Sequence, residues 1–284
     1  MKVLKYKISI CVLTSIILIA TFLTGSAPAS PSKKAVEALS TELIEIKTRP
    51  GVRQKFVLIK PLHPVASVIF FRGGTGLFKF KNRSGKIKIG QGKKLFEMLK
   101  NDFATQGVVV AVIDAPSDKP KGINPSFRMS KEHAQDVKDI VSYLIDTTKL
   151  PIWLFGHSFG TISVAQVGIH AQVGIDGLVF ASPVTQTIKT WGKIFNSNPN
   201  GIIDMDLDKI RVHTFFVYHK DDKCIGTPPS NIPRLKEAVK NSKILELTGG
   251  KTQKSKPCGP LAAHSFFGIE KQFFSTVAEF IKSQ

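Results

Sequence analysis

Ser158 lies in the middle of a Gly-His-Ser-Phe-Gly segment, residues 156–160. A serine hydroxyl becomes an effective nucleophile when a tight turn exposes it and a nearby base removes its proton. Glycines two residues before and two residues after the serine relieve the crowding in such a turn. An apolar run precedes the segment and a helical pattern follows it. The pattern therefore predicts a nucleophilic serine at a strand-to-helix turn.

A nucleophilic serine needs a histidine as its base, and the order of residues along the chain narrows the choice. Where a serine occupies such a turn, the acid and then the histidine follow it in sequence. The chain has seven histidines, of which only His264 lies beyond the candidate acids near residue 221. Its segment follows the last predicted strand and precedes the last predicted helix. His264 is therefore the predicted base.

Two adjacent carboxylates, Asp221 and Asp222, directly follow the predicted strand 212–218. The loop after this strand is where the acid of such a site belongs, and only one of the two side chains can point at the imidazole. Spacing along the chain favours Asp222, and Asp221 remains the alternative. Asp222 would hold the histidine in its working orientation and stabilise the imidazolium.

Cys224 follows Asp222 by two residues, and Cys258 precedes His264 by six. The chemistry requires the acid loop and the histidine loop to lie within hydrogen-bond reach of each other. Residues 1–29, which contain the third cysteine, Cys11, have the pattern of a cleaved signal peptide, so only these two cysteines would remain in the exported chain. Two cysteines in an exported chain form a disulfide more often than they remain free thiols. We therefore expect a Cys224–Cys258 disulfide beside the site.

The oxyanion of the reaction requires backbone N–H donors close to Ser158. One predicted donor is the N–H of Phe159, the residue after the nucleophile. The second is expected in the glycine-rich loop 73–76, where Gly74 is the first choice and Thr75 the second. Residues 114–118 directly follow the predicted strand 108–113 and therefore lie at the same edge of the predicted sheet as the glycine-rich loop. They are interpreted as a hydrogen-bonded turn rather than as a source of a catalytic carboxylate.

Alternating strands and helices must hold these residues in place. The predicted strands are 42–47, 55–60, 65–71, 108–113, 152–155, 177–181, 212–218 and 243–248. The predicted helices are 93–105, 130–147, 162–170, 232–239 and 270–281. This alternation predicts an α/β fold with a mostly parallel, doubly wound sheet and helices on both faces. Residues 184–209 have no clear pattern and are interpreted as a small lid insertion.

Residues 1–29 have the pattern of a cleaved signal peptide. Three lysines precede a mostly apolar stretch, residues 8–23, and an Ala-Pro-Ala site ends at Ala29. The stretch is shorter than the roughly 20 residues of a membrane-spanning helix, which disfavours an uncleaved anchor. We expect a mobile leader at 30–40, a single domain at 41–284, and a periplasmic or secreted location.

The chain is strongly basic, with 40 Lys and Arg against 21 Asp and Glu and a formal net charge of +19. This charge favours anionic partners: an anionic ester substrate or an anionic envelope surface. Basic residues are concentrated at 79–94, after the glycine-rich loop, and at 251–256, before His264. No nucleic acid is expected, because no binding motif accompanies the charge. No cofactor is expected either, since metal clusters, dinucleotide fingerprints and phosphate loops are absent from the sequence.

These residues together resemble the α/β-hydrolase superfamily over most of residues 41–284, in particular its exported bacterial serine hydrolases. The resemblance rests on Gly73-Gly74, the segment 156–160, Asp222 and His264, and also on the Asp-Ala-Pro-Ser-Asp sequence at 114–118 and the two cysteines. It implies a Ser-His-Asp hydrolase that works through an acyl-enzyme. His219 departs from the family pattern, which has a small residue there, and this leaves the choice between the two aspartates open.

Hydrolysis of a small-molecule carboxylic ester is the function that this resemblance favours. An amidase, a peptidase or an acyltransferase would use the same residues, so the sequence leaves these activities as alternatives. A non-catalytic binding protein on a hydrolase scaffold is a further alternative. It would be expected to lack a member of the triad, and this sequence supplies all three.

Overall fold

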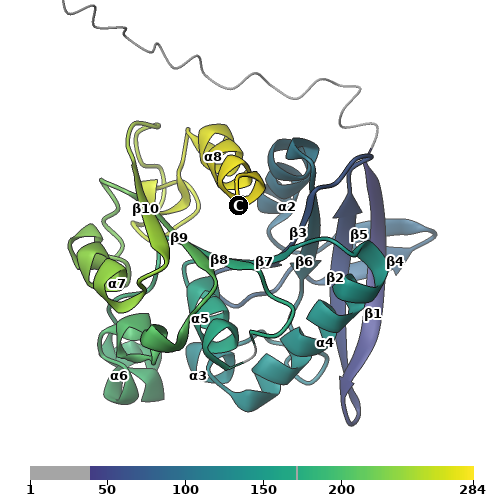
Figure 1. The fold of residues 1–284 in the computed structure, drawn as a ribbon, viewed down its shortest axis with the longest axis horizontal. Helices are drawn as coiled ribbons and strands as arrows, with labels where there is room; N and C mark the ends of the chain where they lie inside the picture. The colour runs from purple at the N-terminus through teal and green to yellow at the C-terminus, as the bar shows by residue number, and fades with distance from the viewer. Residues whose placement is uncertain (1–38, 171) are drawn as a thin grey trace, which may run out of the picture.

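The computed structural model of the chain describes residues 39–170 and 172–284. Within them, a central eight-stranded sheet has the order β1-β2-β6-β3-β7-β8-β9-β10 (Figure 1). The strands from β6 to β10 in this order run parallel, and β1 and β2 are joined antiparallel at one edge. The strands are β1 (Ser40–Arg49), β2 (Val52–Lys60), β3 (Ala66–Phe71), β6 (Val108–Ile113), β7 (Ile152–His157), β8 (Gly177–Ala181), β9 (His213–His219) and β10 (Ser242–Leu247).

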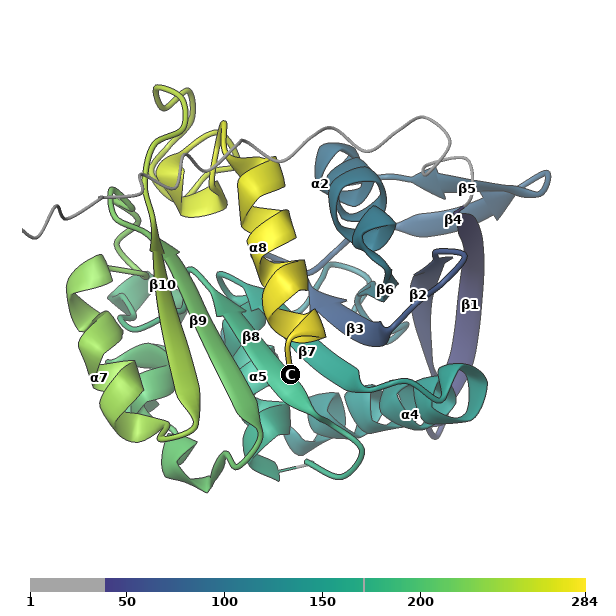
Figure 2. The same cartoon turned by 45° about the horizontal axis from the view of Figure 1, so that its top comes forward.

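Helices cover both faces of this sheet, as the sequence predicted. Helices α2 and α8 lie on one face, and α4, α5 and α7 lie on the other (Figure 1). Figure 2 shows α8 lying across the middle of the sheet. The helices are α2 (Lys93–Met98), α3 (Pro125–Arg128), α4 (Lys131–Thr148), α5 (Gly160–His170), α6 (Lys193–Ser197), α7 (Ile232–Ala238) and α8 (Glu270–Lys282). The predicted mostly parallel α/β fold is therefore confirmed.

The continuous apolar runs of the sequence are strands whose two faces are both buried. In β3, Val68 and Phe70 pack against the α2 and α8 side, whereas Ile69 and Phe71 pack against the α4 and α5 side. Successive side chains of a strand point to opposite faces, so a strand covered on both sides must be apolar throughout. These central strands form the rigid layer from which the loops of the candidate site emerge.

Helix α4 begins and ends at residues suited to those positions. The Ser130 hydroxyl accepts a hydrogen bond from the His133 N–H (3.1 Å), which satisfies one of the free donors of the first turn. Lys149 ends the helix in the left-handed region, with φ 54°. Between them, Val137, Ile140 and other apolar residues at helical spacing are buried against the sheet.

Three segments differ from the predicted elements or add detail to them. A two-stranded hairpin, β4 (Phe80–Arg83) and β5 (Lys86–Ile89), precedes α2 and was not predicted, because its lysines mask the alternation of a strand. The predicted helix 93–105 is α2 followed by a π-helical turn and a 3-10 turn. The segment 184–209, interpreted as a lid, consists of α6 and short 3-10 turns.

The predicted signal peptide and nearly all of the predicted leader lie outside the described residues. Among the residues that are described, no helix combines the length and the apolar character required to cross a membrane.

Candidate active site

Ser158 occupies the turn that joins β7 to α5, in the left-handed region of backbone conformation with φ 55°. A non-glycine residue there is strained, so the surrounding contacts must hold it in place. The Ser158 N–H donates to the Ala181 carbonyl (3.0 Å), and its own carbonyl accepts from the Thr161 N–H (2.8 Å). The turn thus projects the serine side chain at the carboxyl end of the sheet.

The two flanking glycines are required by close backbone packing. A Cβ on Gly160 would lie 2.0 Å from the Phe71 carbonyl oxygen of β3, and a Cβ on Gly156 would lie 2.4 Å from the Gly160 carbonyl oxygen. Real Cβ contacts do not reach such distances. The start of α5 can therefore approach β3 and β7 only because both positions lack a side chain.

His264 is buried, with 1% of its surface exposed, in a 3-10 turn between β10 and α8. Its Nδ1 lies 3.0 Å from Oδ2 of Asp222. The same carboxylate accepts hydrogen bonds from the Thr227 hydroxyl (2.7 Å) and the Cys224 N–H (2.8 Å). These donors fix the carboxylate, and the carboxylate in turn fixes the imidazole, so that Nε2 is the ring nitrogen left for chemistry.

Asp221 and Asp222 have different surroundings. Asp222 is 5% exposed and contacts His264, whereas Asp221 is exposed to solvent. The Asp221 N–H donates to Nδ1 of His219 (3.0 Å), and Nε2 of His219 donates to the Gly249 carbonyl (2.9 Å). His219 therefore braces the loop between β9 and the histidine segment, which explains why a large residue stands at this position.

The backbone of His264 is held from two other strands. Its carbonyl accepts hydrogen bonds from Nε2 of His157, at the end of β7 (2.9 Å), and from the Ser182 hydroxyl, just after β8 (2.8 Å). Burial lowers the pKa of His157 to about 4, so its ring is neutral at pH 7 and carries its proton on Nε2. The sequence did not indicate this role, because chain order excluded His157 only as a base.

The predicted disulfide is present. Cys224 and Cys258 are bonded with Cα atoms 4.5 Å apart, and they join the loop that carries Asp222 to the loop that carries His264. This finding confirms the disulfide prediction.

The glycine-rich loop lies against Ser158. A Cβ on Gly73 would lie 2.9 Å from Cβ of Ser158, so this residue must be a glycine for the loop to approach the serine so closely. The Gly76 N–H donates to the Gly73 carbonyl (3.2 Å), which closes a tight turn. Within the described chain, the N–H groups of Gly74, Thr75 and Phe159 donate no hydrogen bond to protein. The three N–H groups named by the sequence are thus free to bind an oxyanion.

Ser158 and His264 open onto one cavity of about 610 Å³. Its other walls come from α2 and α8 and are largely apolar, with Leu95, Met98, Phe273 and Phe274 among them. No hydrogen bond joins the Ser158 hydroxyl to His264, and Nε2 of His264 is buried without a partner among the described residues. In structures without substrate such hydrogen bonds are often long and tighten only when substrate binds.

Three cationic residues are among those that line this cavity. Arg72 and two lysines of α2, Lys93 and Lys94, contribute to the lining, and Lys94 pairs with Glu270 of α8 (3.3 Å). Burial lowers the pKa of Arg72, and its guanidinium lies 5.2 Å from the centre of the Phe78 ring. The other basic residues of segments 79–94 and 251–256 are exposed and do not line the cavity.

The segment 114–118 enters the expected hydrogen-bonded turn, which the Lys119 N–H closes by donating to the Pro116 carbonyl (2.8 Å), whereas Asp114 holds a neighbouring segment. Asp114 is 7% exposed and accepts hydrogen bonds from the backbone N–H groups of Phe78 (2.8 Å) and Phe80 (2.9 Å). The carboxylate thereby fixes the β4–β5 hairpin to the end of β6, and it contacts neither Ser158 nor His264.

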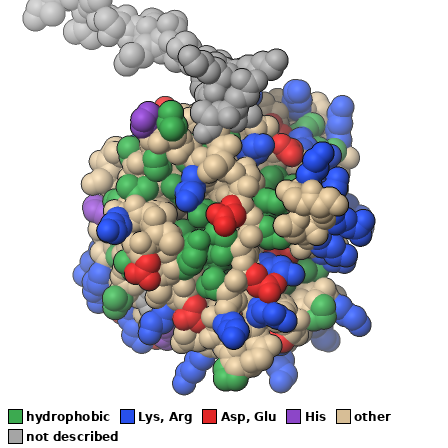
Figure 3. Space-filling model, turned by 90° about the vertical axis from the view of Figure 1, so that its right-hand side faces the viewer, with side chains coloured by type: hydrophobic (Ala, Val, Ile, Leu, Met, Phe, Trp, Pro, Cys, Tyr) green, Lys and Arg blue, Asp and Glu red, His purple; other side chains and the backbone are tan. Residues whose placement is uncertain are grey.

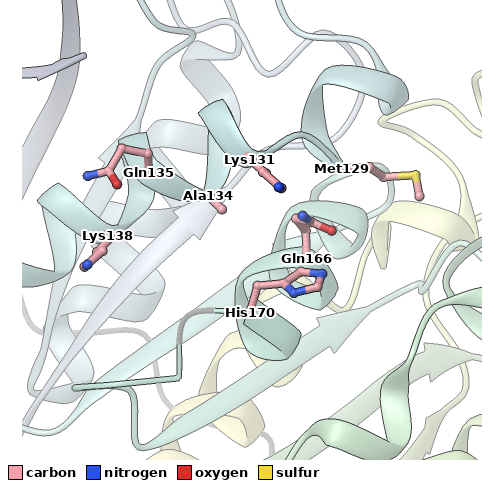
Figure 4. A pocket seen from close by; sticks show the side chains of 7 residues that line it. All are labelled: Met129, Lys131, Ala134, Gln135, Lys138, Gln166 and His170. Carbon is pink, nitrogen blue, oxygen red and sulfur yellow. The ribbon is translucent and has the colours of Figure 1, made fainter. Parts of the chain in front are cut away.

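A second cavity of about 540 Å³ lies between α4 and α5, and Figure 4 shows its lining. The lining residues are Met129, Lys131, Ala134, Gln135, Lys138, Gln166 and His170. None of the residues that the sequence singled out is among them, so the candidate chemistry belongs to the cavity that contains Ser158.

No family model and no curated protein sequence matches this chain. Solved structures resemble it at low sequence identity, and they define its class of fold. A Pyrococcus furiosus esterase is 16% identical with a TM-score of 0.60, over 89% of this chain and 94% of its own. Est1E from Butyrivibrio proteoclasticus with ferulic acid bound is 15% identical with a TM-score of 0.60, over 85% and 98%.

A third similar structure is a predicted CIB-like hydrolase from Thermoplasma acidophilum. It is 15% identical with a TM-score of 0.57, over 87% of this chain and 100% of its own. Together with the mostly parallel sheet, these likenesses show that the chain has the α/β-hydrolase fold.

Proposed function

We propose that this protein is a serine hydrolase that cleaves carboxylic esters with Ser158 as nucleophile, His264 as base and Asp222 as acid. The observation that carries the proposal is the buried 3.0 Å contact between Asp222 and His264 beside a strained serine turn that opens onto the same cavity. The esterases among the similar structures agree with this reaction class.

The reaction would proceed in two steps through an acyl-enzyme. Nε2 of His264 takes the proton of the Ser158 hydroxyl as its oxygen attacks the ester carbonyl, and Asp222 stabilises the imidazolium that forms. The tetrahedral intermediate collapses when His264 returns the proton to the leaving alcohol. Water then attacks the acyl-enzyme with His264 again as base, and Ser158 recovers its proton as the acid product leaves.

The negative charge on the carbonyl oxygen would be held by backbone N–H groups. Phe159 supplies one donor, and Gly74, with Thr75 as the second choice, supplies the other. Support comes from the lack of a protein acceptor for these N–H groups and from the close packing of the glycine-rich loop against Ser158. Donors that are fixed in advance need no reorganisation during the reaction, which is why such sites contribute strongly to rate.

The substrate would be a small-molecule ester with an apolar portion and a negative charge. The cavity of about 610 Å³ offers apolar side chains from α2 and α8, and Arg72 and Lys93 are also among its lining residues. Lys and Arg side chains also lie along much of the right-hand margin of the face in Figure 3. A positive rim would attract anionic esters, or the enzyme itself to an anionic envelope surface.

We further propose that the protein acts outside the cytoplasm, in the periplasm or after secretion. Residues 1–29 would be removed as a signal peptide and 30–40 would form a leader before the hydrolase domain, 41–284, with a lid at 184–209. The Cys224–Cys258 disulfide supports this location, because disulfides persist in oxidising compartments.

Covalent labelling tests the proposed nucleophile. A fluorophosphonate probe should label the wild-type protein, whereas Ser158→Ala and His264→Ala should lose labelling and the hydrolysis of 4-nitrophenyl butyrate. The matched controls are Ser230→Ala and His63→Ala, which change an exposed serine and an exposed histidine. Undiminished labelling of Ser158→Ala would show that another residue is the nucleophile. A panel of esters and amides would then separate esterase from amidase activity.

Salt dependence tests the proposed anionic substrate. Raising the salt concentration should slow hydrolysis of an ester with a free carboxylate far more than that of a neutral ester of the same size, because screening weakens long-range attraction. Equal salt responses for the two esters would contradict the proposed role of the cations.

A further inference from the structure

Arg128, the last residue of α3, lies buried behind the glycine-rich loop, with 1% of its surface exposed. Its Nη2 donates to the backbone carbonyls of Arg72 (2.9 Å) and Gly74 (3.1 Å), and its Nη1 donates to the hydroxyl of Ser163 in α5 (2.9 Å). One guanidinium therefore bridges the loop that would supply one oxyanion donor and the helix whose start would supply the other.

The charge of Arg128 has no partner of opposite sign. Among the described residues, no carboxylate lies within salt-bridge distance of it, whereas Arg49 pairs with Asp118 and Asp136. Burial lowers the pKa of Arg128 to about 9, which leaves it protonated at pH 7. Because an unpaired buried charge is costly to a fold, its presence beneath a candidate site indicates a role beyond packing.

The loop is shaped around this side chain. Gly76 has φ 74°, and a Cβ there would lie 3.0 Å from Nη2 of Arg128. His133 packs nearby against the rings of Phe71 and Phe127. Its pKa is lowered to about 3, mainly by burial and next by the charge of Arg128, so the imidazole is neutral. The environment thus accommodates one positive charge at this point and excludes a second.

The hydrogen bond to Gly74 sets the direction of a neighbouring N–H. The Gly74 carbonyl and the Thr75 N–H belong to one trans peptide, in which the two groups point in opposite directions. Holding the carbonyl toward Arg128 turns the Thr75 N–H away from it. The loop donor that this contact would orient is therefore Thr75, the second of the two choices, because the Gly74 N–H belongs to the preceding peptide. A charged donor on the carbonyl also polarises the peptide and strengthens its N–H as a donor.

We propose that Arg128 is a positioning residue of the oxyanion site: it fixes and polarises the Gly74–Thr75 peptide and places a permanent positive charge behind the loop that faces Ser158. This proposal rests on the proposed serine hydrolase function. Arg128 would stabilise the transition state, in which negative charge develops on the substrate oxygen, more than the bound neutral ester.

Kinetics of Arg128→Met and Arg128→Lys test the proposal with 4-nitrophenyl butyrate as substrate. Arg128→Met should lower kcat about 100-fold, as the loss of an oxyanion donor does, with KM changed less than about three-fold. Arg128→Lys should lower kcat about 10-fold, because a single ammonium cannot reproduce the planar fork that joins two carbonyls and a hydroxyl. Affinity for a boronic acid inhibitor, which forms a negatively charged tetrahedral adduct with the serine, should fall in parallel with kcat.

Arg49→Met is the matched control, since it removes a partly buried arginine whose partners are the carboxylates of Asp118 and Asp136 instead of carbonyls of the loop. It should lower the melting temperature while leaving kcat and inhibitor affinity within about three-fold of wild type. If Arg128→Met does not fold, Arg128→Lys carries the same comparison.

Folded Arg128 variants with wild-type kcat and inhibitor affinity would overturn the proposal. It would also be overturned if Arg49→Met lost as much kcat as Arg128→Met, because the loss of kcat would then follow the loss of stability. A wild-type protein that hydrolyses no ester and resists the fluorophosphonate probe would overturn the proposed function, and this proposal with it. If wild type is labelled and active, the comparison of the Arg128 variants with Arg49→Met decides whether Arg128 has a positioning role or only a structural one.

Discussion

The Cys224–Cys258 disulfide closes the chain segment that runs from just after Asp222 to just before His264, and the two cysteines are 34 positions apart in sequence. Cross-linking a loop of this length removes chain entropy from the unfolded state worth about 3.8 kcal/mol at 25 °C in the loop-closure model. Replacing both cysteines with alanine should therefore lower the free energy of unfolding by roughly 4 kcal/mol. For a protein of this size the melting temperature should fall by roughly 10 °C.

The same variant should lose activity for a geometric reason. Cys224 donates its N–H to Asp222, and the bonded Cys258 ties the histidine loop to this point, so without the bond the contact between Asp222 and His264 is less firmly held. We expect kcat for 4-nitrophenyl butyrate to fall about 10-fold or more at 25 °C, since misplacement of catalytic groups lowers rate sharply.

Urea unfolding followed by circular dichroism measures the stability, and initial rates measure the activity. Wild type treated with a reductant serves as the comparison, because it should match the alanine variant in both properties. A change in unfolding free energy below 1 kcal/mol would refute the loop-closure reasoning. An unchanged kcat in a destabilised variant would show that the bond stabilises the fold without holding the acid and the histidine together.

Three further predictions concern single side chains. Asp222→Asn should lower kcat by about 10³- to 10⁴-fold and Asp221→Asn by less than three-fold, because only Asp222 contacts the histidine; equal effects in rate assays would contradict this. His133 is neutral in the fold, with its pKa lowered from 6.5 to about 3 by burial, whereas the unfolded chain protonates it near 6.5. Stability should therefore fall as pH drops from 6.5 toward 3, by on the order of 4 kcal/mol, and His133→Leu should flatten this part of a melting-temperature profile while His63→Leu does not. Gly160→Ala should destabilise the fold by about 2 kcal/mol or more, because its Cβ would meet the Phe71 carbonyl at 2.0 Å; a wild-type melting temperature would refute the packing argument.

The sequence predicted the sheet well because its central strands are covered on both faces and appear as apolar runs. It failed for the β4–β5 hairpin, whose strands are short and rich in exposed lysine and are held by a carboxylate, Asp114, from a distant strand. Hydrogen bonds between residues far apart in the chain leave no periodic signal.

The same reason explains which parts of the candidate site could be predicted. Ser158 and the disulfide follow from local patterns and from chain order. Arg128 and Thr227 do not, because each lies in an unpatterned segment and its role depends on where the fold places a carbonyl or a carboxylate. An arginine shortly before a helix gives no indication that its charge is buried without a counter-ion.

The carbonyl of His264 is held by His157, the last residue of β7, and by Ser182, which directly follows β8. The position of the imidazole is therefore a property of the sheet as much as of its own loop. A chimera that received only the histidine segment from this chain would acquire the side chain without the anchors that locate it. Transfer of this site to another scaffold of the same fold would require both anchors, together with the disulfide, to be moved as one unit.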